Sequence, residues 1–182
     1  MLRSRTIALP FVVERITKAD VAADLYAVEE LARGSFSDGG FSAVEEIARP
    51  WSRIWVARPE AETAAASRLA PIAFLVAWHV ADELHVLNIA TEPSMRRRGI
   101  ARMLMDVALD YARDARIRIV LLEVRRSNRA AIKLYRGLGF TAMGVRPGYY
   151  ADNDEDAIEM MLALDPDTGR VLPGRDEIRI DG

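Results

Sequence analysis

Apolar residues along the chain follow two spacings, and each spacing predicts one kind of element. Continuous or β-branched apolar runs indicate strands, whereas apolar residues three and four positions apart indicate one face of a helix. Strands are expected at residues 11–16, 54–57, 72–79, 84–91, 117–124, 140–145 and 157–164. Residues 59–71, rich in alanine and charge, are predicted to form either a hairpin connection or a frayed turn of helix between the second and third of these strands.

Helical spacing is clearest in the segment that starts at Ile100. Its apolar residues recur at intervals of three and one, which places them on one helical face. These residues are Ile100, Met103, Leu104, Val107, Ala108 and Tyr111. Similar patterns predict helices at residues 21–32, after a capping box at 17–20, and also at 42–48 and 131–138.

The order of these elements predicts the fold class. From residue 84 to residue 138 they alternate strand, helix, strand, helix, and such a crossover implies parallel pairing of the two strands. Antiparallel hairpins are expected on either side, giving a mixed α/β sandwich in a single domain over residues 1–164. Residues 165–182 contain proline, glycine and many charges, so they are predicted to form a C-terminal tail with the mobility typical of chain ends.

Composition narrows the classes of protein that fit this pattern. The 182 residues include 25 basic and 27 acidic side chains, so the formal charge of −2 provides no overall field to attract nucleic acid. The chain has no cysteine, which excludes disulfides and thiol nucleophiles and fits a reducing cytoplasm. The longest uncharged apolar stretch, residues 69–81, is shorter than the about 20 residues of a membrane span. No signal peptide is expected, because Pro10 and Glu14 interrupt the apolar start.

A basic loop lies directly before the best-defined helix. Its sequence is Arg96-Arg97-Arg98-Gly99-Ile100-Ala101. The first amides of a helix lack intrahelical partners and carry the positive end of the helix dipole, so they favour an anion. Gly99 lets a phosphate approach the backbone and arginines add charge-assisted donors, which favours the diphosphate of an adenine nucleotide. The alternative is a solvated helix start, but basic residues there oppose the dipole and destabilise the helix unless an anion is bound.

Several ordered motifs resemble the GNAT acetyltransferase superfamily. The pattern Arg96-x-x-Gly99-x-Ala101 is similar to its coenzyme A signature. Further segments resemble the RimI-like branch, the ribosomal-protein-alanine N-acetyltransferases. They are Asn88-Ile89-Ala90-Thr91-Glu92-Pro93, Leu122-Glu123-Val124-Arg125-x-Ser127-Asn128, Ala131-Ile132-x-Leu134-Tyr135-x-x-Leu138-Gly139-Phe140, and Tyr149-Tyr150 followed by Glu155-Asp156-Ala157. The resemblance extends from about residue 84 to residue 164 and implies the GNAT fold, a mostly antiparallel sheet splayed between its fourth and fifth strands.

The resemblance implies an acetyl-CoA site built from separate parts of the chain. The residues implied are Ile89, Ala90, Thr91, Arg96, Arg97, Arg98, Gly99, Ile100, Ala101, Arg102, Asn128 and Tyr135. At Ile89, Ala90 and Thr91 the useful atoms would be backbone amides of the splayed strand, which bind the pantetheine arm and polarise the acetyl carbonyl. Asn128 also has a simpler explanation as the start of the following helix, and both roles can hold.

Glu123 and Tyr135 are the candidate catalytic residues. Glu123 lies near the end of a strand, where an open sheet offers a crevice to a ligand. An α-amino group has a pKa of about 8 and attacks only when deprotonated, and a carboxylate can take that proton. Without the resemblance, an ion pair with Arg125 or another arginine would explain Glu123, and core packing would explain Tyr135. The resemblance assigns Glu123 as the base and Tyr135 as the acid that protonates the leaving thiolate.

The acceptor side is where the chain departs from these relatives. Tyr149 and Tyr150 precede the last strand, and the resemblance places such tyrosines beside an incoming peptide N-terminus; an ordinary aromatic turn is the alternative. RimI-like proteins have a Pro-Trp-Ser element before the second helix, whereas residues 37–42 are Ser-Asp-Gly-Gly-Phe-Ser. Phe41 and Ser42 can stand in for Trp-Ser, but the glycines loosen the loop, which puts the acceptor specificity in doubt.

These features predict an acetyl-CoA-dependent N-acetyltransferase for the α-amino group of a protein N-terminus, with an alanine-initiated ribosomal protein as one candidate. The alternatives are acetylation of a lysine side chain or a small-molecule amine, and a non-catalytic acyl-CoA-binding module that regulates a partner. No metal is expected, because His79 and His85 lie in apolar strand patterns without a third ligand. A cytoplasmic monomer or weak homodimer is expected, without membrane binding or direct nucleic-acid binding.

Overall fold

The computed structural model describes residues 11–17, 22–36, 41–60 and 69–180. Its elements are β1 (Phe11–Ile16), α1 (Ala22–Arg33), α2 (Ala43–Ala48), β2 (Ser52–Pro59), β3 (Ala73–Val80), β4 (Glu83–Thr91), the short 3₁₀ helix η1 (Pro93–Met95), α3 (Ile100–Asp114), β5 (Ile119–Arg125), α4 (Arg129–Arg136), β6 (Thr141–Tyr150) and β7 (Glu155–Ala163). The predicted strands and helices are all present. The largest difference is in β6, which continues to Tyr150. The capping box, the glycine loop and the 59–71 connection lie wholly or mostly outside the described residues.

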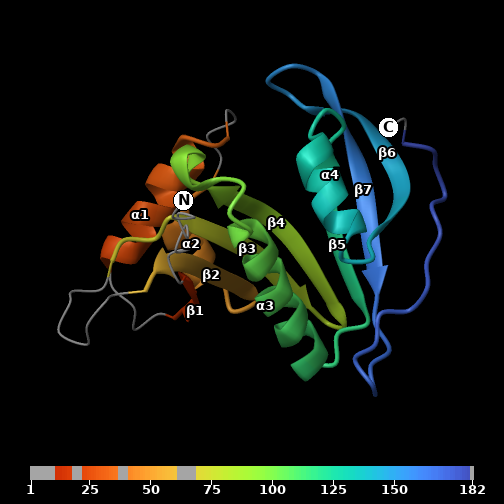
Figure 1. Ribbon diagram of the computed structural model, residues 1–182, viewed down its shortest axis with the longest axis horizontal. Helices are drawn as coiled ribbons and strands as arrows, with labels where there is room; N and C mark the ends of the chain where they lie inside the picture. Colours follow the sequence, from red (N-terminus) through yellow and green to blue (C-terminus); the bar gives the residue numbers. More distant parts are fainter. Residues whose placement is uncertain (1–10, 18–21, 37–40, 61–68, 181–182) are drawn as a thin grey trace, which may run out of the picture.

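The strands form one sheet in the order β1-β2-β3-β4-β5-β7-β6 (Figure 1). The pairing of β4 with β5 is parallel, as the crossover through α3 requires. All other neighbours pair antiparallel. Strand β7 lies between β5 and β6, so α4 connects two strands that are not direct neighbours. The mixed, mostly antiparallel sheet is therefore confirmed.

The sheet opens between β4 and β5. Their pairing runs only from Glu83 opposite Ile119 to Val86 opposite Leu122. At that point β4 has an irregularity, because Asn88 pairs with Val76 while Val86 pairs with Ala77, which leaves Leu87 as an extra residue. A bulge of this kind bends the strand and increases its twist. The last residues of β4 thus lose β5 as a partner, which gives the splay that the resemblance implied.

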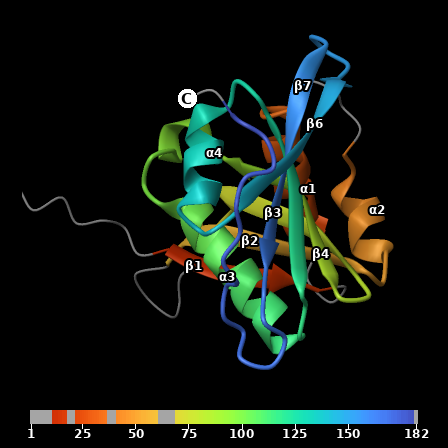
Figure 2. The same cartoon turned by 90° about the vertical axis from the view of Figure 1, so that its right-hand side faces the viewer.

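Helices cover the two faces of the sheet unequally (Figure 2). Helices α3 and α4 lie on one face, and their apolar residues form the larger core with the alternate side chains Val120, Leu122 and Val124 of β5. Helices α1 and α2 lie on the other face, over a core that contains residues of β1 to β4 and none of β5, β6 or β7. The side chains of β5–β7 on this second face are therefore only partly covered. We call this surface the open face.

Residues 165–180 lie against the domain, along the side of β6 and β7 (Figure 1). Leu172 donates a backbone hydrogen bond to Ala163, and Asp176 accepts one from the Ala142 amide at 2.9 Å. The Ala142 amide, followed by Arg136, holds the pKa of Asp176 below its usual range. Ile178 and Ile180 pack against the larger core. The segment expected to be a tail thus supports β6 and the end of α4.

Candidate active site

The basic loop enters α3 through two left-handed residues. Gly99 is the N-cap of α3, with φ 81° and ψ 2°, and Arg97 has φ 63°. Glycine adopts such a conformation without strain, whereas a non-glycine residue there is uncommon. Left-handed turns gather successive backbone N–H groups into a concave site for anions. A Cβ on Gly99 would meet no atom within 4 Å, so the space above the helix start is open to a ligand.

The three arginines of the loop have different surroundings. The Arg96 Nε atom donates to the Thr91 carbonyl at 3.1 Å, which ties the loop to the end of β4. Arg97 and Arg98 are exposed and form no ion pair within the described part of the chain. Two uncompensated positive charges at the positive end of a helix dipole are unfavourable. They fit a polyanion such as a diphosphate.

The residues after the loop anchor α3 in the fold. Ile100 is buried in the larger core, and Ala101 is half-buried. Arg102 is exposed, pairs with Asp106 at 3.5 Å and reaches the Gly137 carbonyl at the end of α4. Arg102 therefore has partners within the domain, in contrast to Arg97 and Arg98.

The end of β4 borders the opening in the sheet. The Ile89 side chain packs against the larger core, whereas Ala90 belongs to the core under α1 and α2. Thr91 is buried, and its hydroxyl oxygen has no hydrogen-bond partner among the described residues. An unpaired buried hydroxyl is costly, and this oxygen is inaccessible in the structure, so a ligand would reach it only after neighbouring residues move. The open space at Gly99 is the feature that fits a bound coenzyme.

Asn128 has the simpler role that the sequence suggested. It is the N-cap of α4, and its side-chain oxygen accepts from the Ala131 amide at 3.1 Å. The side-chain NH₂ group has no bond to the described residues, so it remains available to a ligand.

Tyr135 lies on α4 and faces the larger core. The residue is 4% exposed, and its ring lies 5.8 Å from that of Phe140. Burial raises the pKa of its hydroxyl far above the ordinary value of 10.0, because the phenolate would be poorly solvated. The hydroxyl makes no hydrogen bond to the described residues. Tyr135 therefore packs in the core, and its hydroxyl is protonated at neutral pH.

Glu123 lies on the open face, opposite to the core side chains of β5. Its side chain is 31% exposed and accepts a hydrogen bond from Arg146 Nη1 at 2.9 Å. The ion pair considered for Glu123 thus exists, although its partner is Arg146 and not Arg125. Glu123 is also directly opposite Glu159 of β7.

Arg125 belongs to a separate network at the β6–β7 turn. It pairs with Asp152 at 2.9 Å and with Glu155 at 3.3 Å, and its guanidinium lies 3.9 Å from the ring centre of Tyr150. Desolvation raises the pKa of Tyr150 to about 12. Hydrogen bonds from Ser127 lower the pKa of Glu155 to about 2.

Tyr149 and Tyr150 end β6 and touch each other edge to face, with ring centres 5.2 Å apart. Tyr149 is 42% exposed, and the Arg146 guanidinium lies 4.3 Å from its ring centre. The two tyrosines thus form an ordered aromatic wall at the end of β6, each ring in contact with an arginine. Arg146 itself was not among the predicted site residues. The strand order that brings it near Glu123 cannot be read from spacing along the chain.

Phe41 lies at the edge of the smaller core. Its ring stacks on the buried Phe74 at 5.5 Å, and Phe36 contacts the same ring edge-on. Ser42 caps α2 by accepting from the Glu45 amide. Phe41 therefore packs in the smaller core, just before α2. Its ring contact is with Phe74 and not with the aromatic wall.

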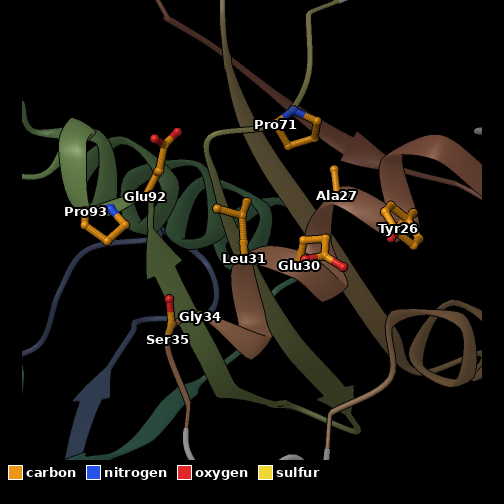
Figure 3. Close-up of a pocket in the computed structure, with 9 residues that line it drawn as sticks. All are labelled: Tyr26, Ala27, Glu30, Leu31, Gly34, Ser35, Pro71, Glu92 and Pro93. Atoms are coloured by element: carbon orange, nitrogen blue, oxygen red, sulfur yellow. The ribbon is translucent and has the colours of Figure 1, made fainter.

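An unpredicted pocket of about 470 Å³ lies between α1 and the junction of β4 with η1 (Figure 3). It is open and largely apolar, and none of the predicted site residues lines it. Its lining residues are Tyr26, Ala27, Glu30, Leu31, Gly34, Ser35, Pro71, Glu92 and Pro93.

Neither histidine of the described ranges belongs to a cluster of metal ligands. No three His, Asp or Glu side chains in those ranges are grouped to bind a metal. His79 contacts the Tyr111 hydroxyl and the Ala81 carbonyl, and His85 contacts Glu83 at 2.7 Å. No helix of the described segments is long and apolar enough to cross a bilayer.

Known proteins resemble this chain in sequence and in fold. The [ribosomal protein bS18]-alanine N-acetyltransferase of Salmonella typhimurium is 43% identical over 94 residues, which are 50% of this chain and 64% of that protein. The chain thus spans less than two thirds of the length of that curated relative. The crystal structure of the ribosomal-protein-S18-alanine N-acetyltransferase from Escherichia coli matches with a TM-score of 0.69 and 26% identity, over 85% of this chain and 94% of that chain.

A nourseothricin acetyltransferase structure also matches, with a TM-score of 0.53 and 31% identity over 62% of this chain and 65% of that chain. The family model of the acetyltransferase (GNAT) family matches residues 23–140, which is more than half of the chain. This match covers α1 to α4, including the opening between β4 and β5 and the loop that enters α3. The chain therefore belongs to the GNAT acetyltransferase family.

Proposed function

We propose that this protein is an acetyl-CoA-dependent N-acetyltransferase that acts on the α-amino group of a protein N-terminus. The observation that carries the proposal is the opening between β4 and β5. The basic loop and the open start of α3 support a polyanion site on one side, and the Glu123 carboxylate lies directly after the end of the β4–β5 pairing. The opening thus has a cofactor side and an acceptor side.

On the cofactor side, the chain offers donors suited to coenzyme A. Arg96, Arg97 and Arg98, with the amides from Gly99 to Arg102, would hold the diphosphate. Those backbone groups of Ile89, Ala90 and Thr91 that do not bond β3 would bond the pantetheine arm, and the Asn128 amide would add a further donor. Bound acetyl-CoA supplies the thioester that an amine can attack.

On the acceptor side, Glu123 takes a proton from the incoming ammonium, directly or through a water, so that the amine can attack the acetyl carbon. Backbone amides of β4 hold the oxyanion that develops there. As the C–N bond forms and the C–S bond breaks, the Tyr135 hydroxyl gives its proton to the departing sulfur, and the second proton lost by the new amide nitrogen returns to Tyr135 through solvent. A tyrosine hydroxyl is protonated at neutral pH, as this role requires, and burial raises its pKa further.

A peptide acceptor is favoured by the relatives and by the aromatic wall. The Salmonella and Escherichia coli proteins are named alanine N-acetyltransferases of a ribosomal protein. Tyr149 and Tyr150 would flank the peptide beside Glu123, and Phe41 would limit the groove from the α2 side. An alanine-initiated ribosomal protein in the cytoplasm is the acceptor we propose.

The test is acetylation of a peptide panel that differs in its first residue, with free lysine and polyamines included, read by mass spectrometry. We expect acetyl-CoA-dependent transfer to N-terminal amines. Glu123→Gln should lower kcat by about 10²- to 10⁴-fold, as expected for loss of a general base. The control Glu45→Gln removes a 74% exposed carboxylate of α2 and should leave kcat unchanged. Wild-type turnover in the combined Glu123→Gln and Tyr135→Phe variant would refute these two assignments.

A small-molecule amine is the second candidate, because the nourseothricin acetyltransferase shares 31% identity with part of this chain. The same cofactor side and the same base would serve such a substrate. Acetylation of the small amines alone, with none of the peptides modified, would favour this candidate over a protein N-terminus. Coenzyme binding without turnover of any amine would instead favour a regulatory module.

A further inference from the structure

Arg146 connects the candidate base to the aromatic wall. It lies on β6, two strands away from Glu123, because β7 is inserted between β5 and β6. Its guanidinium nevertheless crosses the open face and donates to Glu123 Oε1 at 2.9 Å. The ion pair is half-exposed, with side-chain exposures of 46% for Arg146 and 31% for Glu123. An exposed pair of this kind contributes little to folding stability.

The ion pair occupies only one oxygen of the carboxylate. Within the described segments, Glu123 Oε2 accepts no hydrogen bond from another residue. A glutamate side chain has several rotatable bonds, and a charge-assisted hydrogen bond to one oxygen restricts the orientation of both. The contact thus fixes the carboxylate and leaves one oxygen able to take a proton.

Arg146 is itself held by an aromatic ring. Its guanidinium lies 4.3 Å from the ring centre of Tyr149, within the range of a cation–π contact. The Tyr149 ring is supported edge-on by Tyr150. Tyr149, Arg146 and Glu123 therefore form a chain of contacts from the aromatic wall to the end of β5.

The neighbouring Arg125 provides an internal contrast. It also stacks on a tyrosine, Tyr150, but its charge is shared by Asp152 and Glu155 at the β6–β7 turn. Only the second arginine–tyrosine pair, Arg146 with Tyr149, reaches the candidate base. Arg125 stabilises the turn, whereas the contacts of Arg146 point to a role in the site.

We propose that Arg146 is a positioning residue for Glu123, holding the carboxylate so that its free oxygen meets the acceptor amine. The inference rests on the proposed function, since it assumes that Glu123 is the base. Loss of the contact should lower kcat by about 10- to 100-fold, because small displacements of a reacting group have effects of that size. The Michaelis constant for acetyl-CoA should stay the same, because Arg146 lies on the acceptor side.

The experiment compares Arg146→Gln, Arg146→Lys, Glu123→Gln and the double variant Arg146→Gln/Glu123→Gln. Initial rates are measured with acetyl-CoA and the best peptide of the panel, with enzyme in excess for the slowest variants. Arg146→Lys should restore part of the rate, because an ammonium can replace one donor. The control is Arg118→Gln, which breaks an exposed ion pair with Asp82 at the other end of β5 and should not change kcat. Thermal melting of each variant checks its folding.

The double variant separates the outcomes. If Arg146 acts through Glu123, Arg146→Gln lowers kcat in the wild-type background and has no further effect in Glu123→Gln. An unchanged kcat in Arg146→Gln, or an equal loss in both backgrounds, would overturn the positioning role while leaving the proposed base intact. Wild-type kcat in Glu123→Gln would instead remove the base itself, and the role of Arg146 with it.

Discussion

The start of α3 and the β6–β7 turn both concentrate charge beside the opening in the sheet, but they treat it in opposite ways. At the start of α3, Arg97 and Arg98 have no acidic partner among the described residues, and the helix dipole adds to their unfavourable charge. At the β6–β7 turn, Arg125 is balanced by Asp152 and Glu155 and covered by an aromatic ring. Positive charge without an acidic partner suits a site that binds an anionic ligand. Positive charge that is paired with carboxylates suits a turn with a structural role.

The largest effect is expected when the unbalanced charge is removed. Changing Arg97 and Arg98 together to glutamine should raise the Michaelis constant for acetyl-CoA by about 100-fold, since each charge-assisted contact contributes about 1.5–3 kcal/mol and some are partly replaced by water. The unliganded protein should melt at the same or a slightly higher temperature, because an unfavourable charge–dipole interaction is lost. Steady-state kinetics and calorimetry measure the two quantities. A lower melting temperature with unchanged kinetics would contradict the assigned role.

The next effect concerns the C-terminal segment, residues 165–180, that packs against β6 and the core. Deleting residues 165–182 should lower the free energy of unfolding by about 2–4 kcal/mol, because Ile178 and Ile180 lose their packing and the Ala142 amide loses Asp176. Denaturant titration measures the change. Asp176→Asn is the milder control, since it keeps an acceptor for the amide but loses the charge that pairs with Arg136. Equal stability of the truncated and full-length proteins would show that the segment contributes nothing to the fold.

Low pH should lower the stability that Glu155 contributes at the β6–β7 turn, over a defined pH range. The pKa of Glu155 is about 2 in the folded protein and 4.5 ordinarily, so its stabilising contribution is present above pH 4.5 and is lost as the pH falls toward 2. Glu155→Gln should therefore be less stable than wild type at pH 6, and the difference should disappear near pH 2. Thermal melts across this range measure it. A difference that is independent of pH would contradict the assignment.

The smallest effect is expected at the tip of the wall. Tyr149→Phe keeps the ring that stacks on Arg146 and should change kcat by less than about threefold, whereas Tyr149→Leu loses a contact of about 0.5–1 kcal/mol. Peptide acetylation rates compare the two variants. A large loss in Tyr149→Phe would show that the hydroxyl, rather than the ring, acts on the acceptor.

Much of the fold followed from local patterns. The apolar stripe from Ile100 to Tyr111 identified α3, and the crossover around it identified the parallel pair, because both depend on residues close in the chain. Asn128 as an N-cap was predictable for the same reason. The proposed roles of Glu123 and Tyr135 came from the resemblance, and they remain proposals. The attachment of residues 165–180 was missed, since its partners, such as Ala142, are distant in sequence.

The sequence by itself determined the helices and strands, the GNAT family and the basic loop at the start of α3. Each of these depends on residues that are close together in the chain. Only the tertiary structure decided which charges are balanced. The registers of β6 on β7 and of β7 on β5 place Arg146 within reach of Glu123 across β7 and leave Arg125 to the turn, although Arg125 is only two residues from Glu123 in the chain. Ion pairs depend on distance in space, and strand order and register set that distance.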